Sequence, residues 1–128
     1  MRAHIVKNNF QIKKNKYKLK LRSFDVIHGL IKATGFVFEK IAYISDCNKI
    51  PSSSLKNLYG LNFLIIDCLR MKKHPSHFNY DDALNIIKLL KPKKAILTNL
   101  HTDLDYSTLK KKLPKNIVPA FDGLSFSF

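Results

Sequence analysis

The sequence predicts a mixed α/β fold, built as a single domain over residues 1–128. In the amino-terminal third, apolar and charged side chains alternate with the two-residue period of half-buried strands. From about residue 50 onward, short apolar runs alternate with segments of helical spacing, which is typical of a sheet with parallel strands. Hydrophobic residues make up 45% of the 128 residues, enough for one core and too few residues for two ordinary domains.

The first expected elements are antiparallel strands. Residues 17–22 alternate Tyr or Leu with Lys or Arg, and residues 24–27 form a second extended stretch that runs into His28. Two apolar segments, residues 35–38 and 41–44, flank a Glu-Lys pair. This arrangement predicts a β-hairpin.

The rest of the chain is expected to alternate helices and strands. Pro51 and the three serines after it form an N-cap cluster, in which a serine side chain is expected to cap the start of a helix. Residues 61–66 predict a buried strand. Asn79 is the expected N-cap of a helix that Pro92 ends. The remaining expected elements are a strand at residues 95–98, a helix capped by Asp105, and strands at residues 117–118 and 124–128.

The chain is strongly basic, and the excess charge lies near its start. The 23 Lys and Arg and 9 Asp and Glu give a formal net charge of +14, and no acidic residue precedes Asp25. Such a balance is typical of proteins that bind nucleic acid, an anionic membrane or an acidic substrate. The alternative is a Lys-rich composition whose cations gather on any tolerant surface.

Neither a membrane span nor secretion is expected. Apolar runs are no longer than residues 63–66, far short of a spanning helix, and the start of the chain has no apolar signal region. Cys47 and Cys68 have no C-x-x-C spacing, which fits a reducing cytoplasm. They are interpreted as small buried thiols, with soft metal ligation as the alternative.

Polar side chains follow several of the predicted strands. Because parallel strands end at one edge of a sheet, these side chains are expected to meet there as a His/Asp metal site. Each aspartate has the alternative role of capping a turn or helix. The candidates at this edge are His28, Asp46, Asp67, Asn99 and His101, with His74 and His77 in the long loop at residues 68–79.

Seven segments resemble, in the same order, one branch of the metallo-β-lactamase-fold hydrolases. That branch contains the phosphoribosyl cyclic phosphate phosphodiesterase and is related to endonucleases that trim tRNA 3′ ends. The resemblance runs from about residue 20 to the end of the chain. The segments are V-I-H-G at 26–29, G-F-V-F at 35–38, I-A-Y-I-S-D at 41–46, L-I-I-D-C-L-R at 64–70, H-P-S-H-F at 74–78, K-A-I-L-T-N-L-H-T-D-L-D-Y at 94–106 and P-A-F-D-G-L at 119–124.

The resemblance implies a site with two divalent metal ions, zinc or manganese, that activate water for attack on phosphorus. It implies that His28 is a metal ligand, that Asp46 is the carboxylate bridging both ions, and that His77 is the general acid. Many relatives have L-T-H where this chain has L-T-N at 97–99. The ligand of the second metal is therefore assigned to His101, with Asn99 as the alternative.

The family signature H-x-H-x-D-H, which supplies most metal ligands, is absent from the sequence. The resemblance therefore implies the C-terminal half of a four-layer αββα metallo-β-lactamase fold. Its partner would be a missing N-terminal half or a second copy. The expected function is a metal-dependent phosphodiesterase acting on a small phosphodiester. The alternative is a non-catalytic, basic half-domain that binds nucleic acid.

Overall fold

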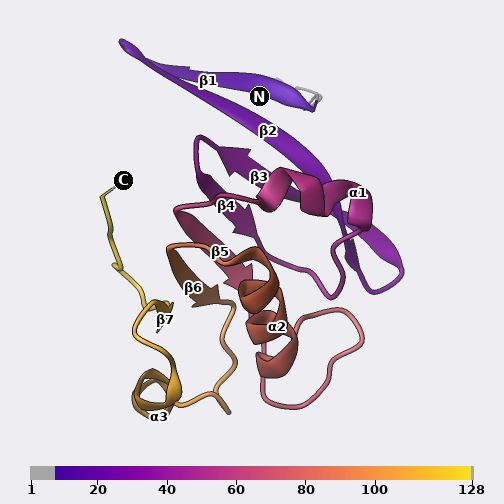
Figure 1. Cartoon of the computed structure of the whole chain (residues 1–128), viewed down its shortest axis with the longest axis vertical. Helices are drawn as coiled ribbons and strands as arrows, with labels where there is room; N and C mark the ends of the chain where they lie inside the picture. The colour runs from indigo at the N-terminus through magenta and orange to yellow at the C-terminus, as the bar shows by residue number, and fades with distance from the viewer. Residues whose placement is uncertain (1–7, 128) are drawn as a thin grey trace.

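The computed structural model of the chain describes residues 8–127, which form a mixed sheet with three short helices and one 3₁₀ turn (Figure 1). Over these residues the sheet has seven strands that lie side by side in chain order. This architecture confirms the predicted mixed α/β fold. The elements are β1 (Asn9–Lys14), β2 (Tyr17–His28), β3 (Ile31–Phe38), β4 (Ile41–Ile44), α1 (Ser52–Leu55), η1 (Lys56–Leu58), β5 (Phe63–Asp67), α2 (Tyr80–Leu90), β6 (Lys94–Thr98), α3 (Tyr106–Lys112) and β7 (Ile117–Pro119).

The strand directions change at the middle of the sheet. Strands β1 to β4 are successively antiparallel, whereas β4 to β7 are parallel. Because β2 and β4 both run antiparallel to β3, they run in the same direction, and β5 and β6 share it. The carboxyl ends of β2, β4, β5 and β6 therefore lie at one edge of the sheet, as the sequence predicts for the last three.

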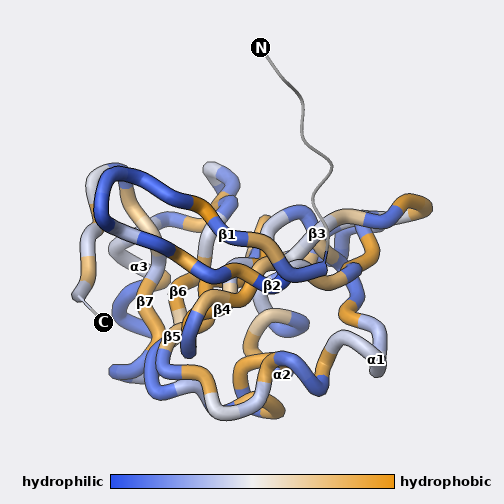
Figure 2. The backbone as a smooth tube through the Cα atoms, turned by 90° about the horizontal axis from the view of Figure 1, so that it is seen from above, coloured by the Kyte–Doolittle hydropathy of each residue, from blue (hydrophilic) through white to orange (hydrophobic). Residues whose placement is uncertain are grey.

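One face of the sheet carries the hydrophobic core beneath the helices. Figure 2 shows α1 and α2 on the same side of the strands. From α2, Ala83, Ile87 and Leu90 are buried in this core, and α3 adds Leu109 and Leu113. This confirms that the helices pack on one face. The strand residues in the same core alternate along the chain and include Ala42, Ile44, Leu64, Ile66, Ala95 and Leu97.

The opposite face of the sheet, here called the outer face, is not covered by any helix of residues 8–127. The pairing of Phe36 with Tyr43 and of Tyr43 with Ile65 places these three side chains together on it. Tyr43 is 41% exposed. The carboxyl-terminal segment covers part of this face, where Phe126 stacks on Phe63 with ring centroids 4.7 Å apart.

Helix ends follow the predicted capping chemistry in α2 and α3. The Asn79 side chain accepts a hydrogen bond from the Asp82 backbone N–H at 3.0 Å, and Asp105 accepts one from Thr108 at 2.8 Å. Lys91 ends α2 in the left-handed region, with a φ of 49°, directly before Pro92. No helix in the described part of the chain combines the length and the apolar character needed to cross a membrane.

Three predicted details are wrong. Pro51 itself occupies the N-cap of α1, and no serine side chain caps that helix. Residues 124–127 form no strand; their apolar side chain at Phe126 packs on the outer face instead of adding a paired strand. The final residue of the predicted strand lies outside the described residues. The stretches 17–22 and 24–27 join into the single strand β2, and its partner β1 is not among the predicted elements.

Gly35 on β3 leaves room for the aromatic ring of Phe24 on the neighbouring strand β2. Phe24 on β2 pairs directly with Gly35 on β3, and both residues are buried. A Cβ atom at Gly35 would lie 2.4 Å from Cζ of Phe24. The Phe24 ring therefore lies over the backbone of Gly35. Phe24 belongs to the hydrophobic core and lies on β2, the strand that ends in His28.

We predict that Gly35→Ala destabilises the protein by about 1–3 kcal/mol, because the added methyl group overpacks the site of the Phe24 ring. Urea unfolding measures the change. The neighbouring exposed Thr34 provides the control, since Thr34→Ala should alter stability by no more than about 0.5 kcal/mol. Equal effects of the two substitutions would contradict the prediction.

Candidate metal centre

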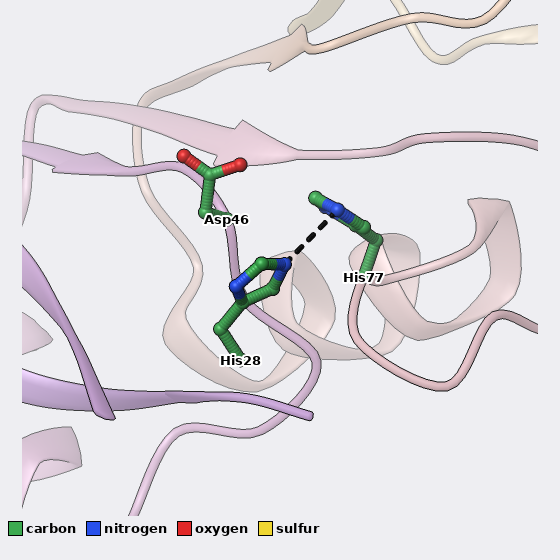
Figure 3. A group of neighbouring side chains, drawn as sticks. All are labelled: His28, Asp46 and His77. Atoms are coloured by element: carbon green, nitrogen blue, oxygen red, sulfur yellow. Dashed lines mark hydrogen bonds between the residues drawn. The ribbon is translucent and has the colours of Figure 1, made fainter. Parts of the chain in front are cut away.

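Three side chains from distant parts of the sequence come together at the edge where the parallel strands end (Figure 3). His28 is the last residue of β2, Asp46 follows β4, and His77 lies in the loop between β5 and α2. One potential ligand atom from each lies within 4.8 Å of the others. The structure therefore brings together three of the four residues assigned from the resemblance.

Asn48 joins the two segments that carry the histidines. Its Oδ1 accepts a hydrogen bond from the Gly29 backbone N–H at 2.9 Å, and its Nδ2 donates to the Pro75 carbonyl at 3.0 Å. Gly29 has a φ of +63°, and a Cβ there would lie 3.2 Å from Cβ of Ser76. A side chain at Gly29 would thus be strained and crowded. The turn after His28 is held close to the loop that carries His77.

A buried carboxylate orients His77. Asp67, at the end of β5, is fully buried, and its Oδ2 accepts from the His77 ring N–H at 2.8 Å. The same oxygen accepts from the Cys47 backbone N–H at 3.0 Å, while Oδ1 accepts from Nδ2 of Asn99 at 3.0 Å. Three donors therefore satisfy a charge that would otherwise be costly to bury.

The two histidine rings face each other through their Nε2 atoms. These atoms are 3.1 Å apart in His28 and His77. Because Asp67 can only accept a hydrogen bond when ionised, the Nδ1 atom of His77 carries a proton and its Nε2 is the atom directed to the site. If Nε2 of His77 also carries a proton, this nitrogen is a hydrogen-bond donor directed toward His28 and Asp46.

His74 lies beside His77 and not within the group of three. The two rings have centroids 5.1 Å apart, and the Ser76 backbone N–H donates to Nδ1 of His74 at 3.3 Å. Desolvation, followed by the nearby Arg70 guanidinium, lowers the pKa of His74. A lowered pKa favours the neutral form of the His74 ring.

His101 lies outside this group. Its side chain is 58% exposed, and Nδ1 contacts Oδ1 of Asp103 at 2.8 Å. Asn99, the alternative ligand, lies nearer the site and bonds to Asp67. Neither residue joins His28 and Asp46 here, so the ligand of a second metal stays a prediction.

Both cysteines are buried and free, in agreement with their interpretation as packing residues. Burial raises the pKa of the Cys47 thiol and of the Cys68 thiol to about 12. A metal binds the thiolate form of cysteine. The raised pKa values favour the neutral thiol form of both cysteines at neutral pH.

Two residues of the site, Asp67 and Asn48, have roles that the sequence leaves open. Asp67 follows a predicted strand, as Asp46 does, and this position in the sequence predicts that it lies at the edge of the sheet. The same position is equally typical of an aspartate that caps a turn. Asn48 has no distinguishing neighbour in the sequence. Only the fold shows that it joins two loops.

The chemistry of the donor set fits a divalent cation. Two imidazole nitrogens and one carboxylate form a nitrogen and oxygen set that suits zinc, and the carboxylate is also a ligand that manganese favours. His28 and Asp46 remain available as ligands when His77 keeps its hydrogen bond to Asp67. With His28 and Asp46 as its protein ligands, a cation would keep open coordination positions for water and substrate.

Comparison with family models identifies the superfamily. Residues 1–99 match the model described as the beta-lactamase superfamily domain. The match spans well over half of the 128 residues. The chain therefore belongs to the beta-lactamase superfamily, and its mixed sheet with helices on one face is part of the metallo-β-lactamase fold.

Solved structures show the same relationship. A diphosphatase from the PhnP family is 34% identical, and the match covers 98% of this chain and 48% of that one, with a TM-score of 0.89. Human tRNase Z, short form, is 18% identical over 94% of this chain and 46% of its own, with a TM-score of 0.70. An isothiocyanate hydrolase from Delia radicum gut bacteria is 17% identical over 98% of this chain and 59% of its own, with a TM-score of 0.68.

The chain spans about half the length of the structures it matches, from 46% to 59% for these three. These structures include those of a diphosphatase and an isothiocyanate hydrolase. A search of curated protein sequences found no match.

We predict that Asp67→Ala lowers the free energy of unfolding by about 3–5 kcal/mol, because it leaves buried donors without an acceptor. The chain contains a matched control, since Asp103 also contacts a histidine at 2.8 Å but is 46% exposed. Asp103→Ala should cost at most about 1 kcal/mol. Chemical denaturation of both variants tests this, and similar losses would show that the Asp67 network does not stabilise the fold.

Proposed function

We propose that this chain forms part of the active site of a metal-dependent hydrolase that cleaves phosphodiester bonds. The observation that carries the proposal is the meeting of His28, Asp46 and His77 at the edge of the sheet, with buried Asp67 behind His77. Superfamily membership supports the hydrolase class. Similarity to a diphosphatase from the PhnP family supports a substrate with phosphorus–oxygen bonds.

His28 and Asp46 would hold the metal. A bound zinc or manganese pair supplies Lewis acidity and a water of lowered pKa. Asp46 is exposed at the edge, so both of its oxygens are free to contact separate cations. His101 or Asn99 would supply the protein ligand of the second metal ion.

His77 would act as the general acid. Its Nδ1 proton is held by Asp67, so the ring is fixed with Nε2 toward the site. In the charged form of the ring, Nε2 carries the second proton. In that form Nε2 can give a proton to the departing ester oxygen, a step worth about 10²–10⁴ in rate.

We further propose that the remaining metal ligands come from a polypeptide packed on the outer face, either an N-terminal half of the same fold or a second copy. Phe36, Tyr43 and Ile65 form an apolar surface there without a helix over it. The PhnP-family diphosphatase contains about as much chain again beyond the matched 48%. The two free thiols fit a reducing compartment, so we place the enzyme in the cytoplasm, acting on a small phosphodiester.

Metal binding tests the first step. We expect Asp46→Ala and His28→Ala to weaken zinc or manganese binding about 10-fold or more, since even residues behind the ligands contribute this much. Calorimetric titration of this chain measures it. Asp81→Ala, which removes an exposed carboxylate on α2, should leave binding unchanged. A parallel loss in His101→Ala would assign that residue as a ligand, and unchanged binding in Asp46→Ala would refute the metal site.

Leaving-group dependence tests the role of His77. The protein encoded by the longest reading frame that contains this chain should hydrolyse phosphodiesters in the presence of Mn²⁺. His77→Ala should lower kcat about 10²–10⁴-fold for an alkyl ester, whose oxygen needs a proton to depart. The loss should be much smaller for bis(p-nitrophenyl) phosphate, whose leaving group is stable as an anion. Equal losses on both substrates would exclude His77 as the general acid.

A further inference from the structure

The β1–β2 hairpin extends beyond the rest of the sheet (Figure 1). Its strands pair along their whole length, from Asn9 opposite Arg22 to Lys14 opposite Tyr17. Pairing of β2 with β3 begins only at Arg22. Residues 10–21 therefore form a two-stranded ribbon beyond the residues of β2 that pair with β3.

Because side chains alternate between the two faces of a strand, the ribbon has one face of polar and basic residues and another with most of its apolar residues. Residues directly opposite one another share a face, so Lys13 lies with Lys18, Gln11 with Lys20 and Asn9 with Arg22. We call these six residues the basic face. The other face carries Phe10, Ile12, Leu19 and Leu21 and continues into the outer face through the contact of Phe10 with Phe36.

The cations of the basic face are exposed and close to one another. Lys13 and Lys18 are directly opposite across the ladder, an arrangement that destabilises a sheet. Within the described part of the chain, the lysines that form ion pairs are Lys32 with Asp25 and Lys73 with Asp82, both away from this face. Among the described residues, the cations of the basic face therefore form no ion pair with an acidic side chain.

We propose that the basic face binds the sugar–phosphate backbone of a single-stranded nucleic acid. Lys18, Lys20 and Arg22 recur along one strand at about 6.6 Å, twice the rise per residue, which is comparable with the spacing of neighbouring phosphates in an extended strand. Together they extend over roughly 13 Å, too far for one small anion to contact all three. Asn9 and Gln11 add amides that can donate to phosphate or sugar oxygens.

The position of the ribbon's apolar face favours a nucleic acid over a membrane surface. An amphipathic element at a membrane inserts its apolar face into the lipid and keeps its cations on the opposite face. Here part of the apolar face packs on the sheet, because Phe10 contacts Phe36 with ring centroids 6.1 Å apart. The cations of the basic face are the exposed side of the ribbon, which suits a solvated polyanion.

An acidic residue lies at the border of this surface. A hollow of about 480 Å³ is lined by Lys20 and Arg22 together with Glu39. A polyanion at the two cations would be repelled by the Glu39 carboxylate. Removing that charge should therefore strengthen binding.

The basic face is connected to the candidate metal centre by β2 itself. Eight residues separate Lys20 from His28, a span of roughly 26 Å along the strand. An oligonucleotide of about ten residues would be long enough to contact both. Binding to the hairpin does not depend on the proposed hydrolysis, and the test below uses no metal and measures no turnover.

The experiment compares two triple variants with the same change in charge. Lys13→Gln, Lys18→Gln and Lys20→Gln together remove three cations from the basic face, and Lys110→Gln, Lys111→Gln and Lys112→Gln remove three from α3. Fluorescence anisotropy with a labelled 20-nucleotide oligouridylate measures affinity between 50 and 200 mM KCl, with EDTA present. Each phosphate contact adds about 0.7 to the slope of log affinity against log salt, so the hairpin variant should lose about 2 in slope.

We expect the hairpin variant to bind at least 10-fold more weakly at 100 mM KCl, the α3 variant to bind within twofold of the parent, and Glu39→Gln to bind more tightly. Circular dichroism and urea unfolding verify that each variant is folded. Equal weakening of both triple variants would show that net charge alone explains the binding, and it would overturn the proposal. So would absent binding by the parent, or binding to vesicles with 30% phosphatidylserine that exceeds binding to RNA.

Discussion

The arrangement of the candidate centre depends on one buried charge, the carboxylate of Asp67. It accepts hydrogen bonds from three separate parts of the chain: the segment after β4 through Cys47, the segment after β6 through Asn99, and the loop before α2 through His77. A carboxylate without these donors would cost several kcal/mol in the interior. The network therefore fixes the loops relative to one another and gives the ring of His77 a single orientation.

Much of the fold could be predicted because its determinants are local. The antiparallel hairpin of β3 and β4 shows in two apolar segments around Glu39, and the capped helices show in Asn79 and Asp105. The meeting of strand ends follows from the direction of parallel strands, which the alternation of strands and helices implies. The roles of His28, Asp46 and His77 came from resemblance, since their spacing of 18 and 31 residues has no physical meaning without the fold.

The remaining features depend on long-range pairing, which no local pattern encodes. An aspartate at the end of a strand has the same sequence signal whether it caps a turn or, as Asp67 does, supports a histidine. The period-two pattern around Phe126 resembles a strand, yet that residue stacks on Phe63 and the segment pairs with no strand. The basic face could not be recognised before the register placed Lys13 opposite Lys18, because β1 was not among the predicted strands.

The bridge that Asn48 makes between Gly29 and Pro75 has a consequence for how a metal would be held. His28, a proposed metal ligand, and His77, the proposed general acid, are 49 residues apart in the sequence. Bringing two such side chains together has an entropic cost that grows with the length of the chain between them. Here ordinary hydrogen bonds within the protein bring them together. In small zinc domains the metal organises the chain, and binding and folding are one event. The hydrogen bonds of Asn48 use protein atoms alone. We therefore expect folding not to require the cation, so that substitutions of the proposed ligands could change the affinity of the centre without loss of the fold.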